Sequence, residues 1–324
     1  MKAESLWFTS PGKTELRKNI LPEVKKGRCR IQTLYSAVSP GTERLVLSGK
    51  IPSKLFNSMA CPYMEGKFSF PVKYGYSLVG KVTVGPKSLI GRIVHLLHPH
   101  QNKCVVRTRD AHPVPSAVPP ARAVLASNLE TAVNAVWDSG VLLGEKVLVI
   151  GFGIVGSLTA RLLSMIPGVQ VTIVENHPTK AVLAEKMGFH AADANSLSAD
   201  FDMIFHASGS PEGLQLALDQ TGFEGKIVEL SWYGDTEAPL KLGGRFHNKR
   251  LRIISSQVSH IPAEMRPHWD KNRRKKLVFR LLENELFDQH MTHTVSFSEL
   301  PSLYSRLIQG PSDGLNYLVR YPEN

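Results

Sequence analysis

Residues 146–156 read KVLVIGFGIVG, and this stretch decides the fold class of the 324-residue chain. After Lys146 the first residues are apolar on both faces, as a strand buried inside a parallel sheet requires. A Gly-x-Gly-x-x-Gly pattern follows at once, and from Ile154 onward apolar residues recur at helical spacing. The stretch therefore predicts a buried strand, a tight turn and a helix in direct succession.

The three glycines of this turn suit a phosphate-binding loop. Gly151 permits the tight turn, Gly153 lets backbone N–H groups approach a pyrophosphate, and Gly156 allows close packing of helix and strand. The next strand ends in Glu175, whose carboxylate can accept hydrogen bonds from both hydroxyls of an adenosine ribose and would repel a 2′-phosphate. We therefore expect a dinucleotide site for NAD rather than NADP.

Two residues close to Glu175 qualify this expectation. His177 and Lys180 carry groups that could weaken the preference for NAD over NADP. The alternative interpretation is a structural glycine turn with a surface glutamate, but the strand before the turn and the helix after it favour the dinucleotide site.

The remaining pattern predicts two kinds of domain. Apolar runs at 169–174, 202–206, 226–230 and 251–255 alternate with helical segments, which predicts a doubly wound parallel sheet, the Rossmann arrangement. The first hundred or so residues carry shorter alternating runs cut by Pro and Gly, which are typical of a small β-rich domain. The chain is therefore expected to be an α/β protein with two domains.

A cluster of four prolines at 113–120 indicates a boundary between these domains. Directly after it, apolar residues at helical spacing predict a helix that stops at Gly140. Ser127 and Glu130 have the spacing of a capping box, in which each side chain bonds a backbone N–H at the helix start.

Composition excludes several classes of protein. With 42% hydrophobic and 21% charged residues, the chain is neither disordered, collagen-like nor a disulfide-rich miniprotein. Cys29, Cys61 and Cys104 form an odd set without Cys-x-x-Cys spacing, which argues against a disulfide framework and a structural zinc site. The sequence shows no secretory leader and no membrane-length apolar run, so we expect a cytoplasmic protein without membrane insertion.

The formal charge of +11 comes from one segment. Residues 241–280 hold twelve of the 39 Lys and Arg residues but only two of the 28 Asp and Glu residues. The helix expected at 271–282 opens with cations, which opposes the helix dipole and suggests a bound anion: a carboxylated substrate, a partner subunit or a surface. A solvated helix face is the alternative. Only Trp269 and Phe279 are aromatic nearby, too few for nucleic-acid binding.

The order of these parts resembles the medium-chain dehydrogenase/reductase superfamily, in which a β-rich domain is followed by a Rossmann domain and a return to the first. The resemblance includes Ala207-Ser208-Gly209-Ser210 and the closing stretch 292–300. It implies a GroES-like catalytic domain of residues 1–122 and 262–324, a Rossmann domain of residues 123–261, and a homodimer joined through the last Rossmann strand.

Four short stretches resemble one branch of that superfamily, the bacteriochlorophyllide a dehydrogenase-like proteins. They are 39–45, 73–76, 98–101 and 128–132. Many members of this branch have no known substrate, so the branch name implies no activity. The superfamily resemblance also implies further cofactor contacts, from Thr131, Ile154, Val155, Ala207, Ser208 and Gly209.

The resemblance lacks its metal ligands. Zinc-dependent relatives bind a catalytic zinc through two cysteines and one histidine, and the matching positions here are Pro40, Tyr76 and Ser127. Proline has no donor atom, and neutral Tyr and Ser are poor zinc ligands compared with imidazole and thiolate. We therefore expect no catalytic zinc at the inherited position.

Without zinc, positioned hydrogen-bond donors must stabilise the charge that develops on a substrate oxygen. Tyr76 is the candidate donor, and Thr42 and His100 are the candidates for a proton relay. Tyr76 could instead be packing in the vacated metal pocket, and Thr42 a turn residue beside Gly41. His98 and His100 could bind a different metal together with Glu43, or belong to an ordinary loop.

These features predict an enzyme similar to alcohol dehydrogenases, with a small-molecule substrate bound between the domains. The expected reaction is an NAD(H)-dependent, zinc-independent interconversion of a secondary alcohol and a carbonyl by hydride transfer. One alternative is a reductase of quinones or activated C=C bonds, and another is a non-catalytic NAD(H)-binding sensor or scaffold. The candidate proton donors favour an enzyme.

Overall fold

The structure is a computed structural model and describes residues 1–198 and 200–322. The chain divides into two compact units, which consist of Met1–Ser127, Phe279–Ser312 and Asn316–Asn324 in the first, and of Asn128–Val278 and Asp313–Leu315 in the second. Residues 262–278 thus group with the second unit, whereas they are predicted above to belong to the first domain. No helix of the described part of the chain has both the length and the apolar character needed to cross a membrane.

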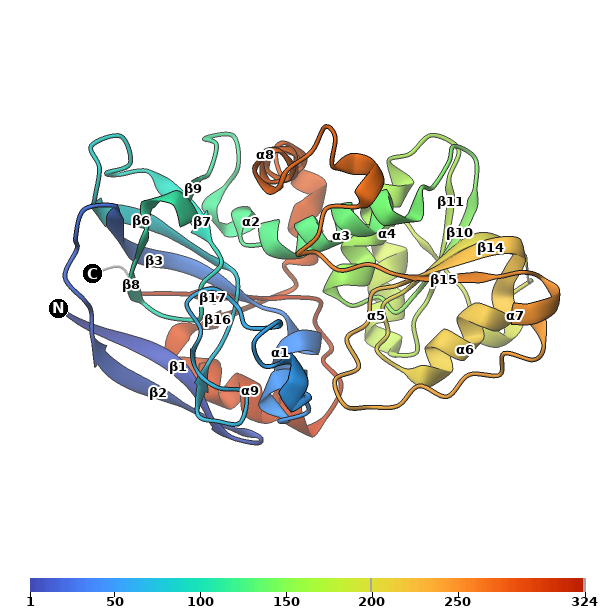
Figure 1. Cartoon of the computed structure of the whole chain (residues 1–324), viewed down its shortest axis with the longest axis horizontal. Helices are drawn as coiled ribbons and strands as arrows, with labels where there is room; N and C mark the ends of the chain where they lie inside the picture. The colour runs from blue at the N-terminus through green and yellow to red at the C-terminus, as the bar shows by residue number, and fades with distance from the viewer. Residues whose placement is uncertain (199, 323–324) are drawn as a thin grey trace. The chain divides into compact units, whose positions relative to one another are not determined.

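A six-stranded parallel sheet forms the centre of the second unit (Figure 1). Its strands, in spatial order, are β12 (His190–Ala191), β11 (Gln170–Val174), β10 (Lys146–Ile150), β13 (Phe201–His206), β14 (Thr221–Glu229) and β15 (Arg252–Ser255). The order reverses at β10, which pairs with β11 on one side and β13 on the other. This is the Rossmann order that the alternating pattern predicts, and ligands of such sheets bind at the carboxyl ends of the strands near the reversal.

Helices precede, connect and follow the strands of this sheet. They are α3 (Ala126–Ser139), α4 (Ile154–Ser164), α5 (Pro178–Lys186), α6 (Pro211–Gln220), α7 (Arg245–Asn248) and α8 (Lys271–Leu281), with 3₁₀ turns η3 (Ala194–Ser196) and η4 (Ala263–Met265). Helix α4 packs against β10 and β11, and α6 packs against β13 and β14. The core between them is apolar, with Leu148, Ile204 and Ile227 fully buried.

The glycine-rich turn fixes where α4 begins. A Cβ at Gly156 would lie 2.0 Å from the carbonyl oxygen of Gly151, so only glycine lets the helix pack this closely on the turn. Gly151 itself has φ +96°, a left-handed conformation that favours glycine. The structure therefore confirms that Gly151 permits the tight turn and that Gly156 allows the close packing of α4 on it.

Two sheets form the first unit. The four-stranded sheet runs in the order β2 (Lys13–Ile20), β1 (Lys2–Ser10), β5 (Val72–Lys73) and β4 (Glu65–Gly66). The seven-stranded sheet runs in the order β16 (His293–Ser296), β17 (Tyr317–Arg320), β3 (Arg28–Val38), β6 (Leu78–Val84), β7 (Ile93–Leu96) and β9 (His112–Pro113), and β8 (Lys103–Arg107) also pairs with β3. Strand β17 is antiparallel to β3, so the C-terminal part of the chain joins the N-terminal sheet.

Short helices complete the first unit. They are α1 (Pro40–Leu47), α2 (Pro120–Ala123) and α9 (Leu300–Gln309), with η1 (Ser53–Leu55), η2 (Thr108–Asp110), η5 (Glu285–His290) and η6 (Phe297–Glu299). Apolar side chains of β3, β6, β7 and β8 form one of its cores, in which Ile31, Leu78 and Val94 are fully buried. The β-rich character expected for the first hundred residues is confirmed.

The capping box expected at the start of α3 is wrong. The helix already begins at Ala126, and the Ser127 hydroxyl donates to the carbonyl oxygen of Tyr76 at 2.8 Å. The Glu130 carboxylate instead receives Arg274, whose Nε lies 3.3 Å from Oε1, and Lys275, whose Nζ contacts Oε2. All three side chains are at most 8% exposed. The sequence spacing alone cannot show this, because the competing cations lie far along the chain.

These ion pairs also explain why α8 opens with cations. Arg274 donates further to the amide oxygen of Asn134 at 2.8 Å, so α3 supplies acceptors along two turns. Arg273 lies over the ring of Trp269, 4.2 Å from its centroid. The Trp269 ring in turn contacts the Trp137 ring at a tilt of 51°, with centroids 4.7 Å apart. Arg274 and Lys275 therefore neither face solvent nor bind an anion from outside the chain. They pair with a buried carboxylate of the same chain.

Glu130→Gln should destabilise the chain strongly, because it leaves two buried cations without a carboxylate. We expect the free energy of unfolding in urea to fall by about 3–5 kcal/mol. The matched control is Glu224→Gln, which breaks the exposed pair with Arg250 (2.9 Å) and should cost below about 1 kcal/mol. Equal losses in the two variants would contradict a stabilising role for the buried pairs.

Candidate functional site

The carboxyl ends of β10 and β11 bring Glu175 to the glycine-rich turn. The backbone N–H of Phe152 donates to Glu175 Oε2 at 2.7 Å, and the N–H of His177 donates to Oε1 at 2.8 Å. A carboxylate offers about four acceptor positions, so two remain for further donors. Glu175, predicted as the acidic residue 20-odd positions after the glycine-rich turn, therefore contacts that turn in the structure.

The turn also leaves room for a ligand beside its backbone. A Cβ built at Gly153 would meet no atom within 4 Å, and α4 begins directly afterwards at Ile154. The first amides of a helix have no acceptor within the helix and carry its positive dipole end, which suits a pyrophosphate. Gly153, Ile154, Val155 and Glu175 are thus arranged as residues that could hold a dinucleotide.

The loop after β13 lies against this turn. The N–H of Ala207 donates to the carbonyl oxygen of Ile150 at 2.8 Å, and a Cβ at Gly151 would lie 2.6 Å from the backbone nitrogen of Ser208. The sequence-predicted residues Ala207 and Ser208 therefore border the glycine-rich turn, and the N–H of Gly209 donates to Ser231 Oγ at 3.1 Å. Thr131, the remaining predicted cofactor contact, lies half-buried on α3.

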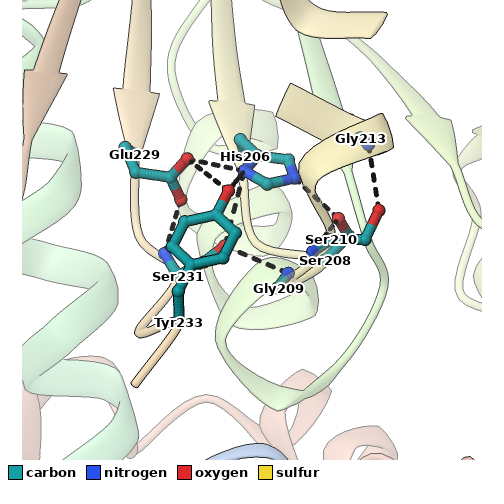
Figure 2. A network of polar contacts seen from close by, with 8 residues as sticks. All are labelled: His206, Ser208, Gly209, Ser210, Gly213, Glu229, Ser231 and Tyr233. Carbon is teal, nitrogen blue, oxygen red and sulfur yellow. Dashed lines mark hydrogen bonds and ion pairs between the residues drawn. The ribbon is translucent and has the colours of Figure 1, made fainter. Parts of the chain in front are cut away.

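A polar network that sequence reasoning missed supports this loop (Figure 2). His206 and Glu229 are register partners at the ends of β13 and β14, and Nδ1 of His206 lies 2.8 Å from Glu229 Oε2. On its other side, His206 Nε2 lies 2.6 Å from Ser208 Oγ. In the sequence, His206 and Glu229 each stand at the end of an apolar run. Only the register of β13 and β14 shows that the two side chains meet.

Two more residues complete the network. Tyr233 donates its hydroxyl to Glu229 at 3.1 Å, and the backbone N–H of Ser231 donates to the other carboxylate oxygen at 2.7 Å. Burial by itself raises the pKa of the Glu229 carboxyl, but the hydrogen bond and charge of His206 and the hydrogen bonds of Ser231 together outweigh it and hold the pKa below its ordinary value. Glu229 is therefore ionised and acts only as an acceptor.

In the first unit, helix α1 brings Thr42 to Tyr76. Pro40 starts this helix, because its fixed φ suits the first helical position. The hydroxyls of Ser39 and Thr42 hydrogen-bond the phenol of Tyr76, which is half-buried. Burial and then the charge of Glu43 raise the pKa of Tyr76 above its ordinary value against these hydrogen bonds, so the phenol keeps its proton.

His100 lies behind this pair, at the Glu43 carboxylate. Its Nε2 is 3.0 Å from Glu43 Oε2, its Nδ1 is 2.7 Å from Ser36 Oγ, and its side chain is fully buried. Glu43 also receives the hydroxyl of Tyr304 and the N–H of Ser39 at 2.8 Å. The structure thus brings Tyr76 and Thr42 into direct contact, whereas His100 reaches them through Glu43.

His98 is held apart from this cluster. Its Nδ1 bonds the carbonyl oxygen of Pro99 at 2.8 Å, and its ring stacks on Tyr63 with centroids 5.3 Å apart. In the described residues, 1–198 and 200–322, no group of three or more His, Cys, Asp or Glu side chains could hold a metal ion. Of the three positions that the resemblance matches to zinc ligands, Tyr76 and Ser127 lie together, because the Ser127 hydroxyl donates to the Tyr76 carbonyl at 2.8 Å.

The buried His98 should make stability depend on pH. Burial lowers its pKa to about 3, against 6.5 when unfolded, so the unfolded chain binds the extra proton between these values. This contribution to stability is complete above about pH 6.5 and is lost by about 1.4 kcal/mol per pH unit as the pH falls toward 3.

Urea unfolding of His98→Asn between neutral and acid pH measures this effect. The Asn amide can still donate to the Pro99 carbonyl, so we expect a flatter fall in the free energy of unfolding than in the unmodified chain. The exposed His260→Asn serves as the control and should leave the fall unchanged. An unaltered slope in His98→Asn would show that His98 is protonated in the folded chain.

Comparison with known proteins finds similarity to dehydrogenases. No protein-family model matches the chain. The chain is similar to D-guloside 3-dehydrogenase of Shigella flexneri, with 23% identity over 217 residues that make up 61% of each protein. It is also similar to 2-dehydro-3-deoxy-L-galactonate 5-dehydrogenase of Pseudoalteromonas atlantica, with 25% identity over 171 residues, 49% of each. The chain thus spans less than two thirds of the length of these relatives.

Solved structures match over nearly the whole chain. A short chain alcohol dehydrogenase from Escherichia coli CFT073, complexed with NADH, has a TM-score of 0.78 at 17% identity and covers 98% of this chain and 99% of its own. The two proteins therefore share a fold, a Rossmann sheet together with a GroES-like β-rich part.

Proposed function

We propose that the chain is an NAD(H)-dependent, zinc-independent oxidoreductase of the medium-chain dehydrogenase/reductase superfamily, which interconverts a secondary alcohol and a carbonyl. The observation that carries this proposal is the contact between Glu175 and the N–H of Phe152, which joins a carboxylate to the glycine-rich turn. The dehydrogenase relatives and the NADH-bound structural neighbour support it.

Different residues of the chain would bind different parts of the cofactor. The amides at the start of α4 would bind the pyrophosphate, and the open acceptor positions of Glu175 would bind ribose hydroxyls. A 2′-phosphate would meet the Glu175 charge, which favours NAD over NADP. When bound, NADH supplies the hydride for reduction of a carbonyl carbon.

When the carbonyl is reduced, Tyr76 supplies the proton. Its raised pKa keeps the phenol protonated, so it can donate to the carbonyl oxygen as the carbon gains the hydride. Thr42 is in hydrogen-bond contact with the phenol and can return a proton to it. His100 acts on this pair by fixing Glu43, whose charge raises the Tyr76 pKa.

We also propose that the chain forms a homodimer through β15. This strand is the edge of the parallel sheet, and its Ile253 is partly exposed, at 36%. An edge strand presents unpaired N–H and C=O groups, which a second copy of the same strand can pair.

The reaction is tested on purified chain after dialysis against a metal chelator. We expect tighter binding of NADH than of NADPH, measured by cofactor fluorescence, and reduction of NAD⁺ with at least one secondary alcohol from a panel of polyols and sugar derivatives. Turnover that requires added zinc would contradict the zinc-independent mechanism. Binding of NADH without turnover across the panel would instead favour a sensor.

Tyr76→Phe tests the proton donor. Removing one hydrogen-bond donor to a developing oxyanion should lower kcat about 10²- to 10³-fold and leave the NADH dissociation constant unchanged. Tyr74→Phe is the matched control, because Tyr74 is fully buried beside Tyr76 and its hydroxyl is contacted by Cys61. An equal kcat for Tyr76→Phe and the unmodified chain would remove Tyr76 from the mechanism.

A further inference from the structure

The polar network at the ends of β13 and β14 connects a fully buried imidazole to the hydroxyl of an exposed serine. His206 has no exposed surface, whereas Ser208 is exposed, and the two are joined at 2.6 Å (Figure 2). Gly213 at the start of α6 leaves room for this contact, since a Cβ there would lie 2.4 Å from Ser208 Oγ and 2.7 Å from His206 Nε2. The fold therefore keeps space for one specific hydrogen bond.

The partners of His206 fix which ring nitrogen carries hydrogen. Nδ1 faces the ionised carboxylate of Glu229 at 2.8 Å, and a carboxylate only accepts, so Nδ1 must be the donor. Tyr233 and the N–H of Ser231 donate to the same carboxylate and hold it in place. In the neutral imidazole, Nε2 is then an acceptor.

This tautomer determines how Ser208 faces a ligand. Because Nε2 accepts, the hydroxyl hydrogen of Ser208 points to His206 and is not available to a ligand. The N–H of Ser210 donates to one lone pair of Ser208 Oγ at 3.2 Å. One lone pair remains, so Ser208 presents an oriented acceptor on the loop that borders the glycine-rich turn.

We infer that Glu229 and His206 are positioning residues that present Ser208 Oγ as a hydrogen-bond acceptor for a ribose hydroxyl of the dinucleotide. The inference rests on the proposed function, since it concerns the same cofactor. Phosphate oxygens only accept, whereas a ribose hydroxyl can donate, so the acceptor selects the sugar and not the pyrophosphate. Glu229 acts through His206, and His206 acts through Ser208.

Dissociation constants of NADH at mildly alkaline pH test the inference. Loss of one hydrogen bond in Ser208→Ala should raise the constant about five- to tenfold. His206→Asn should give a similar rise, because an Asn amide can replace Nδ1 at Glu229 but does not reach Ser208. The double variant should bind no more weakly than Ser208→Ala alone, because His206 acts only through that hydroxyl.

His206→Gln separates positioning from simple stabilisation. A Gln amide can replace Nε2 at Ser208 but loses the bond to Glu229, so this variant should be less stable than His206→Asn and yet bind NADH more tightly. If the dissociation constants instead follow the order of stability, or if the double variant shows additive losses, His206 is only a structural residue and the inference is wrong.

A spectroscopic reading of the tautomer completes the test. The ¹⁵N chemical shifts of His206 should show hydrogen on Nδ1 in the unmodified chain, and in Glu229→Gln, whose amide can donate to Nδ1, hydrogen should move to Nε2. That variant should then bind NADH as weakly as His206→Asn. Hydrogen on Nε2 in the unmodified chain would overturn the inference.

Thr221→Ala is the matched control for lost stability. It removes a buried 2.6 Å hydrogen bond to the carbonyl of Ala217, at the opposite end of β14 from Glu229, and should leave NADH affinity unchanged. Failure of the unmodified chain to bind NADH refutes the proposed function. Binding by the unmodified chain, with equal affinity in Ser208→Ala, refutes only the inference about Ser208.

Discussion

The close approach of Gly156 to the Gly151 carbonyl is the constraint on which the second unit's site depends. No side chain fits between them, since a Cβ would lie 2.0 Å from the oxygen. This contact fixes the start of α4 at the carboxyl edge of the sheet, next to the backbone of Ser208 and to the turn that bonds the carboxylate of Glu175. Three strand ends thus meet at one turn, and a single added methyl group would separate them.

The first unit is organised around a buried charge. Glu43 has no exposed surface, and burial of a carboxylate is costly unless donors surround it. The structure provides three, from His100, Tyr304 and the backbone of Ser39. The same charge raises the pKa of Tyr76 nearby, so the groups that stabilise Glu43 also determine the protonation of the half-buried phenol.

The sequence predicts the parts of the fold that depend on local pattern. The apolar run of β10, the glycines and the acidic end of β11 lie within one short stretch, and their spacing is sufficient to place Glu175 at the turn. Contacts between distant segments could not be predicted in this way. Glu130 has the spacing of a capping residue, yet it binds cations of α8, because a buried carboxylate gains more from two charges than from one amide. His206 and Glu229 meet only through the register of β13 and β14.

The ion pairs of Glu130 also bear on how the chain can be cut into independently folding parts. A fragment that ends after the last strand of the parallel sheet keeps all six strands and the glycine-rich turn, but it removes Arg274 and Lys275 and leaves the Glu130 carboxylate without them inside the protein. The autonomous fragment must therefore extend through Val278, well beyond the sheet that defines the fold. In this protein the boundary of the second unit is set by charge balance and not by strand count.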